Sequence, residues 1–383
     1  MGLCNLFVAT KVKQIVRIST VDLFSGAGGF TEGFKKAGGF ETLLAVDFDQ
    51  QAVKTFSHNH PEINAICEDV THLSTTRLAD LIKKKVDVII GGPPCQGFSL
   101  AGRRLPDDPK NQLFREYVRI VKTLNPEIII FENVVGIVSM QGGLVLEAIC
   151  EEFSAIGYTV AFDVLNAADY GVAQARPRFI LIGRRSGGQV RMPATSHKMF
   201  SENTTIDLFD TELKNHVSVK EALSDLPKIN QGEGAEEQIF TAEPKNEYQV
   251  ATRGERLKNI LFNHRATKHS EEIIKRYGHM PQGGDIRSLP EELRTKKNNV
   301  FRLSDNLPAR TITCNFRTDI IHPWLPRGLT VREAARLQSF DDDYQFFGNL
   351  TRKAKYLTQD DQVGNAVPPL LAKALANHIK SYL

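Results

Sequence analysis

The sequence predicts an α/β fold with a doubly wound, mostly parallel sheet and a second, smaller, irregular domain. Short β-branched runs alternate with helical segments over residues 18–183, a pattern typical of parallel sheets covered by helices. A glycine-rich turn follows the first run, at Ser25–Phe30. From Arg184 to about Thr330 the alternation is lost and the segments are short, which indicates a separate domain of irregular, partly β structure.

The first segments form a nucleotide-type binding corner. Ile18–Phe24 is a predicted strand, Ser25–Phe30 a glycine turn and Thr31–Ala37 a predicted helix. Glycines in such a turn let the backbone approach a ligand closely. Dehydrogenases and many structural turns share this corner, so further residues are needed to interpret it.

Acidic residues follow the next two strands. Glu41–Val46 ends at Asp47, which is placed to accept hydrogen bonds from ribose hydroxyls, with Phe48 beside it to lie against an adenine ring. The weaker strand Ala65–Glu68 ends at Asp69, which is placed to meet an adenine amino group. Together with the glycine turn, these acids favour an adenosine-containing cofactor.

A fourth strand leads to a cysteine. The run that begins at Val86 stops at Gly91–Pro94, since proline cannot donate to a sheet ladder, and Cys95 is the first side chain beyond it. In an open α/β sheet the ligand crevice lies at the carboxyl ends of the strands. We therefore interpret Cys95 as a nucleophile rather than a structural cysteine. The loop Gln96–Lys110 is long for such a connection, which is typical of a binding loop.

The fifth strand brings a carboxylate to the same crevice. A helix over Asn111–Leu124 precedes the strand Glu127–Phe131, which presents Glu132 at its carboxyl end. A capping acid is the alternative, but beside Cys95 a catalytic role is favoured.

Two arginines precede a further strand. After the predicted helix Leu144–Ile156 and strand Val160–Leu165, Arg176 and Arg178 stand at the start of the strand Phe179–Gly183. Their spacing points them to one side, where they could hold a carboxylate and a carbonyl oxygen, although a surface pair has the same spacing.

The C-terminal segments return to regular helices. Thr330–Phe340 has Thr330 as an N-cap and Glu333 to complete a capping box. A second helix, Leu370–Tyr382, is expected to pack on the first domain. We predict a catalytic domain at residues 1–185 completed by 355–383, a target-recognition domain at 186–340, and a hinge at 341–363.

Composition excludes some classes of protein. The chain of 383 residues is 41% hydrophobic and 24% charged, which is typical of a soluble globular protein. No apolar run is long enough to span a membrane, and Met1–Lys13 lacks the features of a secretory signal. Five scattered cysteines form neither a zinc nor a disulfide framework, so we expect no metal and a reducing cytoplasmic location.

Charge is unevenly distributed although the net charge is only +3. Residues 186–250 hold 6 basic and 11 acidic side chains, whereas residues 251–330 hold 15 basic and 8 acidic ones, and ten of the fifteen are arginines. Arginine-rich segments suit phosphates and base edges, but a solvated surface of mixed charge remains an alternative.

Six sequence blocks together closely resemble the DNA (cytosine-5)-methyltransferases of bacterial restriction-modification systems. They occur in the family's order and span nearly the whole chain: Asp22–Phe30 (DLFSGAGGF), Gly91–Ser99 (GGPPCQGFS), Glu132–Val134 (ENV), Gln174–Arg178 (QARPR), Arg327–Phe340 (RGLTVREAARLQSF) and Gly364–Pro369 (GNAVPP). One departure is Asp341, where the family commonly has proline; we expect it to affect only a local turn.

The resemblance implies a large lobe that binds S-adenosylmethionine, a small lobe that recognises DNA, and duplex DNA in the cleft between them. Asp47 would hold the ribose of the cofactor and Phe48 would stack on its adenine. The other cofactor-binding positions implied are Phe24, Gly26, Ala27, Gly29, Asp69, Val70, Pro94, Leu113, Asn365 and Val367.

The resemblance also implies the chemistry. Cys95 would add to C6 of a flipped-out cytosine, Glu132 would share a proton with N3, Arg178 would bind O2, and Arg176 would brace Glu132. The product would be 5-methylcytosine, with S-adenosylhomocysteine released. Positions expected at the DNA are Gln96, Ser99, Arg103, Arg253, Arg256, Arg287, Arg310 and Arg317.

The family further implies a monomeric, nucleoid-associated, stand-alone modification enzyme of bacterial or phage type, with a cognate restriction endonuclease acting on the same site.

Three alternative functions fit part of the sequence. A tRNA cytosine-5 methyltransferase of the related branch carries a Cys-Phe-Thr signature, whereas this chain has Thr313-Cys314-Asn315. A catalytically silent DNA-binding regulator would not need the intact catalytic set. A nicotinamide oxidoreductase would leave Pro94-Cys95 and Glu132 unexplained.

Overall fold

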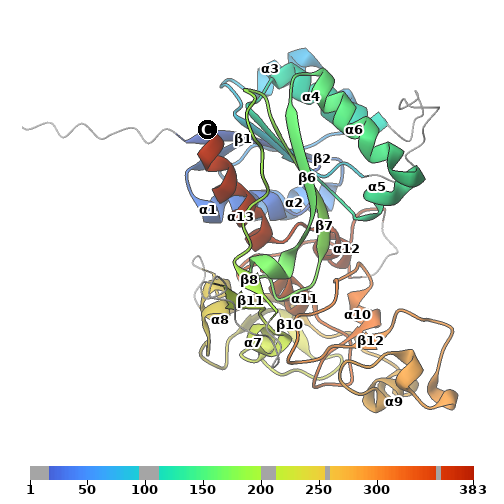
Figure 1. Ribbon diagram of the computed structural model, residues 1–383. Helices are drawn as coiled ribbons and strands as arrows, with labels where there is room; N and C mark the ends of the chain where they lie inside the picture. The colour runs from blue at the N-terminus through green and yellow to red at the C-terminus, as the bar shows by residue number, and fades with distance from the viewer. Residues whose placement is uncertain (1–16, 95–111, 200–212, 255–258, 351–354) are drawn as a thin grey trace, which may run out of the picture.

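The computed structural model describes residues 17–94, 112–199, 213–254, 259–350 and 355–383. Figure 1 shows a half that contains a large sheet with helices on both sides, and a second half of shorter elements. The C-terminal helix, drawn in red, lies in the first half beside α1, the first helix of the chain.

The large sheet has seven strands in the order β3-β2-β1-β4-β5-β7-β6. Strand β7 is antiparallel to β5 and to β6, and the other pairs are parallel. The strands are β1 (Ile18–Leu23), β2 (Phe40–Asp47), β3 (Ala65–Cys67), β4 (Val88–Gly91), β5 (Ile128–Asn133), β6 (Thr159–Asn166) and β7 (Pro177–Arg184). The predicted doubly wound, mostly parallel sheet is confirmed, and its order reverses between β1 and β4, the point where such sheets bind ligands.

Helices cover both faces of this sheet. They are α1 (Gly29–Ala37), α2 (Gln50–Asn59), α3 (Thr75–Leu81), α4 (Gln112–Leu124), α5 (Gly136–Ser139), α6 (Leu144–Ala155) and α13 (Pro369–Ile379). Along β5 the side chains alternate between two hydrophobic clusters: Ile129 packs with residues of α4 and α6, whereas Ile130 packs with residues of α1 and α13. This period of two with apolar residues on both faces is what a buried parallel strand requires.

Close backbone approach fixes α13 on α1. A Cβ added at Gly33 would lie 2.4 Å from Cβ of Ala372 and 2.4 Å from the carbonyl oxygen of Pro369. Only glycine leaves room for this contact, which joins segments more than 300 residues apart along the chain.

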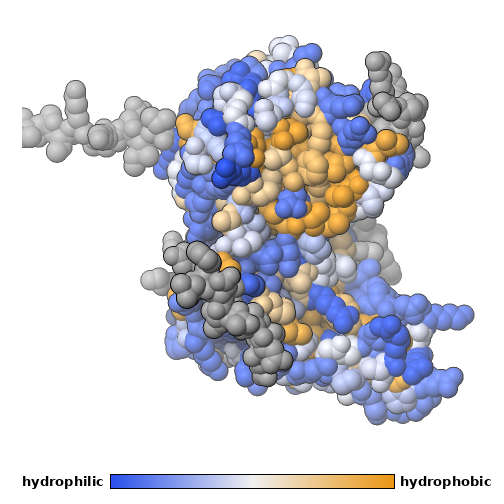
Figure 2. Space-filling model, viewed as in Figure 1, coloured by the Kyte–Doolittle hydropathy of each residue, from blue (hydrophilic) through white to orange (hydrophobic). Residues whose placement is uncertain are grey.

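Strand β6 forms one edge of the sheet and exposes apolar side chains. Phe162 and Val164 are 47% and 36% exposed, and Figure 2 shows hydrophobic colour over this part of the molecule. Asp163 accepts a hydrogen bond at Oδ1 from the backbone N–H of Val164, 2.7 Å away. A charged residue that occupies backbone donors at an edge discourages pairing with another strand.

The second half consists of short elements. Its strands form two-stranded sheets: β8 (His197–Lys198) pairs with β9 (Lys214–Asn215), β10 (Gly234–Ile239) with β11 (Ile260–Arg265), and β12 (Phe301–Arg302) with β13 (Ile320–Ile321). The helices are α7 (Val219–Leu223), α8 (Glu247–Thr252), α9 (Glu271–His279) and α10 (Phe316–Asp319). The structure thus has the irregular, partly β character expected for this region.

Helix α11 (Val331–Leu337) is buried along its whole length. Its predicted N-cap is confirmed, because Thr330 and Glu333 form a reciprocal capping box. The core around it contains Ala27 from the first half and Val363 from α12 (Gln359–Asn365), so α11 packs against both halves of the molecule.

Two arginines one turn apart let this helix be buried without an exposed face. Arg332 donates from Nε to the carbonyl oxygen of Phe262 at 2.8 Å. Arg336 donates to Oδ1 of Asp225 at 2.8 Å and to Oδ1 of Asp342 at 2.9 Å. Removing one partner of a buried charged pair typically costs about 3–5 kcal/mol, so these contacts strongly constrain how the segments around α11 meet.

Asp341 does more than shape a local turn. Its carboxylate accepts hydrogen bonds at 2.7 and 2.6 Å from Nζ of Lys36 on α1. The expectation of a purely local effect is therefore wrong, because an acid at this position joins the segment after α11 to the first helix of the chain.

Candidate active site

The glycine turn after β1 is shaped by three residues with positive φ. Phe24, Gly26 and Gly28 have φ values of 58°, 53° and 92°. A positive φ is costly for phenylalanine and free for glycine, so the turn holds the Phe24 ring in an unusual position at the end of the strand. The backbone N–H of Gly26 donates to Oδ2 of Asp47 at 2.8 Å, which joins the ends of β1 and β2.

Asp47 is buried at the carboxyl end of β2. It also accepts a hydrogen bond at Oδ1 from the backbone N–H of Asp49, 2.9 Å away. Burial raises the pKa of Asp47, while the backbone donors of Asp49 and Gly26 oppose that rise. These donors favour the ionised carboxylate, which is the form that accepts hydrogen bonds from hydroxyl groups.

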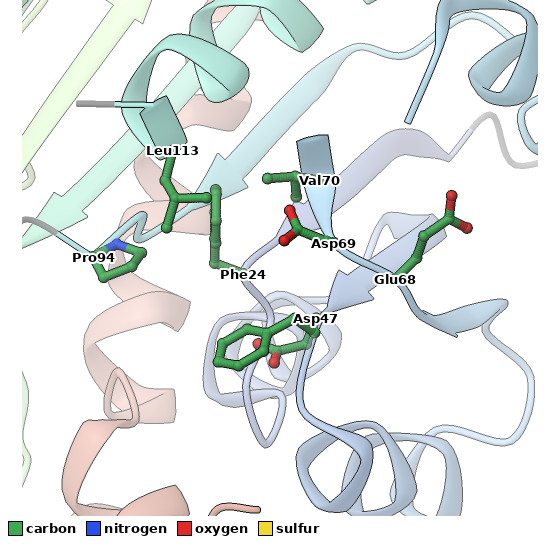
Figure 3. Close-up of a pocket in the computed structure, with 8 residues that line it drawn as sticks. Phe24, Asp47, Glu68, Asp69, Val70, Pro94 and Leu113 are labelled. Carbon is green, nitrogen blue, oxygen red and sulfur yellow. The ribbon is translucent and has the colours of Figure 1, made fainter. Parts of the chain in front are cut away.

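A cavity opens at the carboxyl ends of β1 to β4. It is lined by Phe24, Asp47, Phe48, Glu68, Asp69, Val70, Pro94 and Leu113, and Figure 3 shows side chains from these separate segments grouped around one space. Apolar walls with the carboxylates of Asp47 and Asp69 fit an adenosine group, whose ring needs apolar contact and whose hydroxyl and amino groups donate hydrogen bonds. Seven of the twelve predicted cofactor positions line this cavity. Glu68 was not predicted to line the cavity, although its position next to Asp69 at the end of a predicted strand could have indicated it.

The remaining cofactor positions have other surroundings. A Cβ added at Gly29 would lie 2.1 Å from the carbonyl oxygen of Val367, so these two positions bring the glycine turn and the GNAVPP segment into contact. Ala27 is buried in the core around α11. Asn365 is exposed, and its Oδ1 lies 3.2 Å from Sγ of Cys314.

The Gly-Gly-Pro-Pro turn after β4 lies against the end of β5. A Cβ added at Gly92 would lie only 2.7 Å from Oε2 of Glu132. The side-chain amide of Asn133 donates to the carbonyl oxygen of Pro93 at 2.9 Å. A larger residue at position 92 would therefore displace the Glu132 carboxylate, and Pro94, two residues later, lines the cavity.

Glu132 forms an ion pair with Arg178. Nε of Arg178 lies 3.0 Å from Oε1 of Glu132, and both side chains are 12% exposed. Glu132 is opposite Ile180 in the antiparallel pair of β5 and β7, so Arg178 reaches it along a diagonal of the sheet. Burial raises the pKa of Glu132, although Arg178 and then Arg176 oppose the shift.

Arg176 does not form the expected direct brace for Glu132. Its guanidinium donates to the carbonyl oxygens of Ile312 at 2.9 Å, Gly364 at 2.6 Å and Ala366 at 3.1 Å. Arg176 has no exposed surface, so it joins β7 to two distant segments and acts on Glu132 only through its charge. The bracing contact is made by Arg178 instead.

Several predicted site residues lie outside the described part of the chain. They are Cys95, Gln96, Ser99, Arg103 and Arg256. Their assigned roles stay predictions.

Two predicted DNA-contacting arginines are engaged within the protein. Arg253 donates from Nη2 to Asp225 at 2.7 Å and lies over the ring of Phe240, with 3.5 Å between Cζ and the ring centroid. Arg317 donates from Nη1 to the carbonyl oxygen of Leu350 at 2.7 Å. These contacts engage both guanidinium groups within this half of the molecule, and their predicted role at the DNA stays a prediction. By contrast, Arg287 and Arg310 are exposed.

Across the described ranges, no group of three or more His, Cys, Asp or Glu side chains is placed to hold a metal ion. In the same part of the chain, no helix combines the length and apolar character needed to cross a membrane.

Comparison of the sequence with known proteins identifies relatives over nearly its full length. The family model described as C-5 cytosine-specific DNA methylase matches residues 18–381. The chain is 39% identical to Type II methyltransferase M.DdeI of Desulfomicrobium norvegicum, with 95% of this chain and 89% of that protein covered. It is 37% identical to Type II methyltransferase M1.HphI of Haemophilus parahaemolyticus, with 98% and 90% covered.

Solved structures share the fold. A structure described as a DNA modification methyltransferase encoded within an E. coli prophage superimposes with a TM-score of 0.74 at 28% identity, covering 95% of this chain and 99% of that one. The S. pombe Dnmt2 methyltransferase superimposes with a TM-score of 0.61 at 16% identity, covering 96% and 99%. The second likeness shows the fold alone.

Proposed function

The chain belongs to the C-5 cytosine-specific DNA methylase family, and from that membership we propose that it transfers a methyl group from S-adenosylmethionine to C5 of a flipped-out cytosine within a specific duplex sequence. One observation carries the proposal. The Gly-Gly-Pro-Pro turn contacts Glu132 at Gly92 and lines the cavity at Pro94. The next residue, Cys95, therefore follows directly on a turn that touches both parts of the site.

The cavity residues fit S-adenosylmethionine, which supplies a methyl group made electrophilic by a sulfonium centre. Phe48 and Val70 would hold the adenine, Asp47 would accept hydrogen bonds from the ribose, and Asp69 would accept one from the exocyclic amine. The chain's part is to bind and orient the cofactor at the switch point of the sheet.

Cys95 would activate the cytosine. C5 of a neutral cytosine is a poor nucleophile, so the thiolate bonds to C6 and turns the ring into an enamine whose C5 can accept a methyl group. Loss of the C5 proton then expels the sulfur and restores the ring. Because a stacked base hides both faces, the cytosine must first leave the duplex, at a cost of about a few kcal/mol.

Glu132 and Arg178 would stabilise the added intermediate. Negative charge moves toward N3 and O2 of the ring as the sulfur bonds to C6. A protonated Glu132 would share its proton with N3, and Arg178 would face O2 while it orients Glu132. Arg176 is then a positioning residue, since its hydrogen bonds go to backbone carbonyls.

The two halves of the molecule would divide the work. We propose that residues 186–340 recognise the target sequence while the sheet-containing half binds the cofactor and the flipped base. The names of the relatives, Type II methyltransferases, support the proposal that the chain acts in a restriction-modification system with an endonuclease of the same specificity.

Transfer of a labelled methyl group tests the reaction and its substrate together. Purified protein is incubated with methyl-labelled S-adenosylmethionine and either mixed-sequence duplex DNA or tRNA. We expect label on duplex DNA, and bisulfite sequencing should place it at cytosines of one recurring sequence. Label on tRNA alone, or label on DNA that bisulfite sequencing does not locate at cytosine, would contradict the proposal.

Replacing Phe48 with alanine should weaken cofactor binding. Its ring is 68% exposed at the cavity wall, so its loss should leave the fold intact. Aromatic stacking on a base is worth about 1–3 kcal/mol, which predicts a roughly 5- to 150-fold higher Kd for S-adenosylmethionine by calorimetry. Phe162→Ala, an exposed aromatic on β6 outside this cavity, is the matched control. Equal affinities for the wild type and Phe48→Ala would remove Phe48 from the binding site.

A further inference from the structure

Arg287 is an exposed arginine that is nevertheless held in place. Its side chain is 90% exposed. Asp285 accepts hydrogen bonds from Nη2 of Arg287 at 2.5 Å and from Nε at 3.1 Å, both at Oδ2. The pair sits on a short 3-10 turn, Ile286–Ser288, where Oδ1 of Asp285 also accepts the backbone N–H of Arg287 at 2.9 Å.

This arrangement does little for stability. Exposed ion pairs contribute roughly 0–1 kcal/mol, and a side chain so far exposed buries almost no apolar surface. The capping contact of Asp285 uses the backbone of residue 287 and would remain with another side chain there. What the pair does achieve is to fix the direction of a long side chain that would otherwise sample many rotamers.

Among the described residues, the contacts of the Arg287 guanidinium leave one of its edges free. Asp285 holds the edge formed by Nε and Nη2, so the end formed by Nη1 and Nη2 faces away from the carboxylate. Two parallel N–H donors at that end match O6 and N7 of guanine, the commonest base-specific contact that arginine makes.

Neighbouring arginines lack this property. Arg294 donates from Nε to the carbonyl oxygen of Leu289 at 2.9 Å and from Nη2 to that of Arg287 at 3.1 Å. Arg302 donates from Nη2 to the carbonyl oxygen of Tyr277 at 2.5 Å. These guanidinium groups satisfy backbone carbonyls of the protein, whereas Arg287 is oriented by a carboxylate and projects from the surface.

A continuous set of contacts connects Arg287 to the segment before β7. Asp285 forms a β-bridge with Phe301, and Arg310 lies over the ring of Phe301, with 4.9 Å between Cζ and the centroid. Next to Arg310, Ala309 forms a β-bridge with Gln174.

Two backbone hydrogen bonds flank the bridge between Ala309 and Gln174, which lies in the segment that carries Arg176 and Arg178. The backbone N–H of Ala309 donates to the carbonyl oxygen of Ala173 at 3.0 Å, and the N–H of Ala175 donates to that of Ala309 at 2.8 Å. The segment before β7 is thus linked to Asp285 through Ala309, Arg310 and Phe301, by backbone bridges at both ends and a cation–π contact between them.

We propose that Arg287 reads a guanine of the recognised duplex, with Asp285 as the residue that orients it. This inference rests on the proposed function, because it needs duplex DNA at the site. It adds what that function leaves open: a side chain that determines specificity and the base that it recognises.

The test compares sequence preference rather than activity alone. Wild type, Arg287→Ala, Arg287→Lys and Asp285→Asn are each used to methylate a random-sequence duplex library, which is then read by bisulfite sequencing. We expect the wild-type sequence to require a G·C pair besides the target. In Arg287→Ala that requirement should relax at one position only, with a roughly 10- to 100-fold loss of discrimination there.

The other variants separate charge from geometry. Arg287→Lys keeps the charge but not the two-pronged donor, so it should relax the same position as alanine does. Asp285→Asn keeps a capping acceptor but loses the charged hold on Arg287, and should relax that position to a smaller extent. Arg17→Ala, at an exposed arginine directly before β1 in the sheet-containing half, should leave the preference unchanged, and all four variants should melt like the wild type.

Three outcomes would overturn the inference. The first is an unchanged consensus sequence in Arg287→Ala. The second is a uniform loss of methylation over all sequences in that variant, with the salt dependence of binding reduced by about one phosphate contact. The third is a wild-type consensus sequence without a further required G·C pair. A wild type that methylates no duplex would instead overturn the proposed function, and this is seen before any variant is compared.

Discussion

Replacing Cys95 with serine is expected to abolish methyl transfer while cofactor and duplex binding stay nearly intact. A serine hydroxyl is far less acidic than a thiol, so it cannot supply the anion that bonds to C6. Loss of an essential nucleophile commonly lowers turnover by about 10⁴- to 10⁶-fold. Single-turnover transfer of labelled methyl groups measures the rate, and titration with S-adenosylmethionine and duplex DNA measures the two affinities.

A trapped complex makes this result specific to the sulfur. Duplex DNA with 5-fluorocytosine at the target should bind the wild type covalently, because fluorine cannot leave C5 as a proton does and the sulfur is not expelled. The adduct would be seen as a slower band on a denaturing gel. Cys67→Ser serves as the control, since Cys67 is an exposed cysteine of the same protein and should still be trapped. If Cys95→Ser also formed the adduct, Cys95 would not be the nucleophile.

Replacing Glu132 with glutamine is expected to lower the methylation rate by roughly 10²- to 10⁴-fold, the usual contribution of a positioned acid or base. Glutamine keeps the shape and one acceptor for Arg178, but its amide N–H is not acidic enough to transfer a proton to N3. Because glutamine has nearly the same size as glutamate, the substitution should not disturb the Gly-Gly-Pro-Pro turn, which lies against the Glu132 carboxylate at Gly92. Cofactor affinity should therefore be unchanged.

The dependence of the methylation rate on pH should reflect the protonation of Glu132. Burial raises the pKa of Glu132, so its protonated fraction is high below this raised pKa and falls as pH rises through it. The wild-type rate should accordingly fall on the alkaline side of that pKa, and Glu132→Gln should lack that limb. Glu127→Gln is the matched control, because Glu127 precedes β5 at its opposite end and pairs with Arg184 and Arg185. A limb retained in Glu132→Gln would assign the titration to another group.

Local pattern was enough to predict much of the sheet-containing half. The β-branched runs predicted β1, β2 and β4 to within about two residues, because burial on both faces makes such strands continuous in hydrophobicity. The capping box at Thr330 was equally local, since it depends on residues three apart. Helices α2 and α12 were not predicted, as their apolar residues are too few to give a clear helical period.

The sequence by itself also determined the kind of site: a cysteine after two prolines, acids at strand ends and an arginine pair, which the topology of a doubly wound sheet predicts to lie at one edge. Only the tertiary structure decided which of these residues meet. Arg178 rather than Arg176 contacts Glu132, Arg176 bonds to carbonyls 136 to 190 residues away, and Arg253 joins Asp225. The physical reason is that a guanidinium binds any acceptor within reach, and its neighbours across the fold are set by packing between distant segments rather than by spacing along the chain.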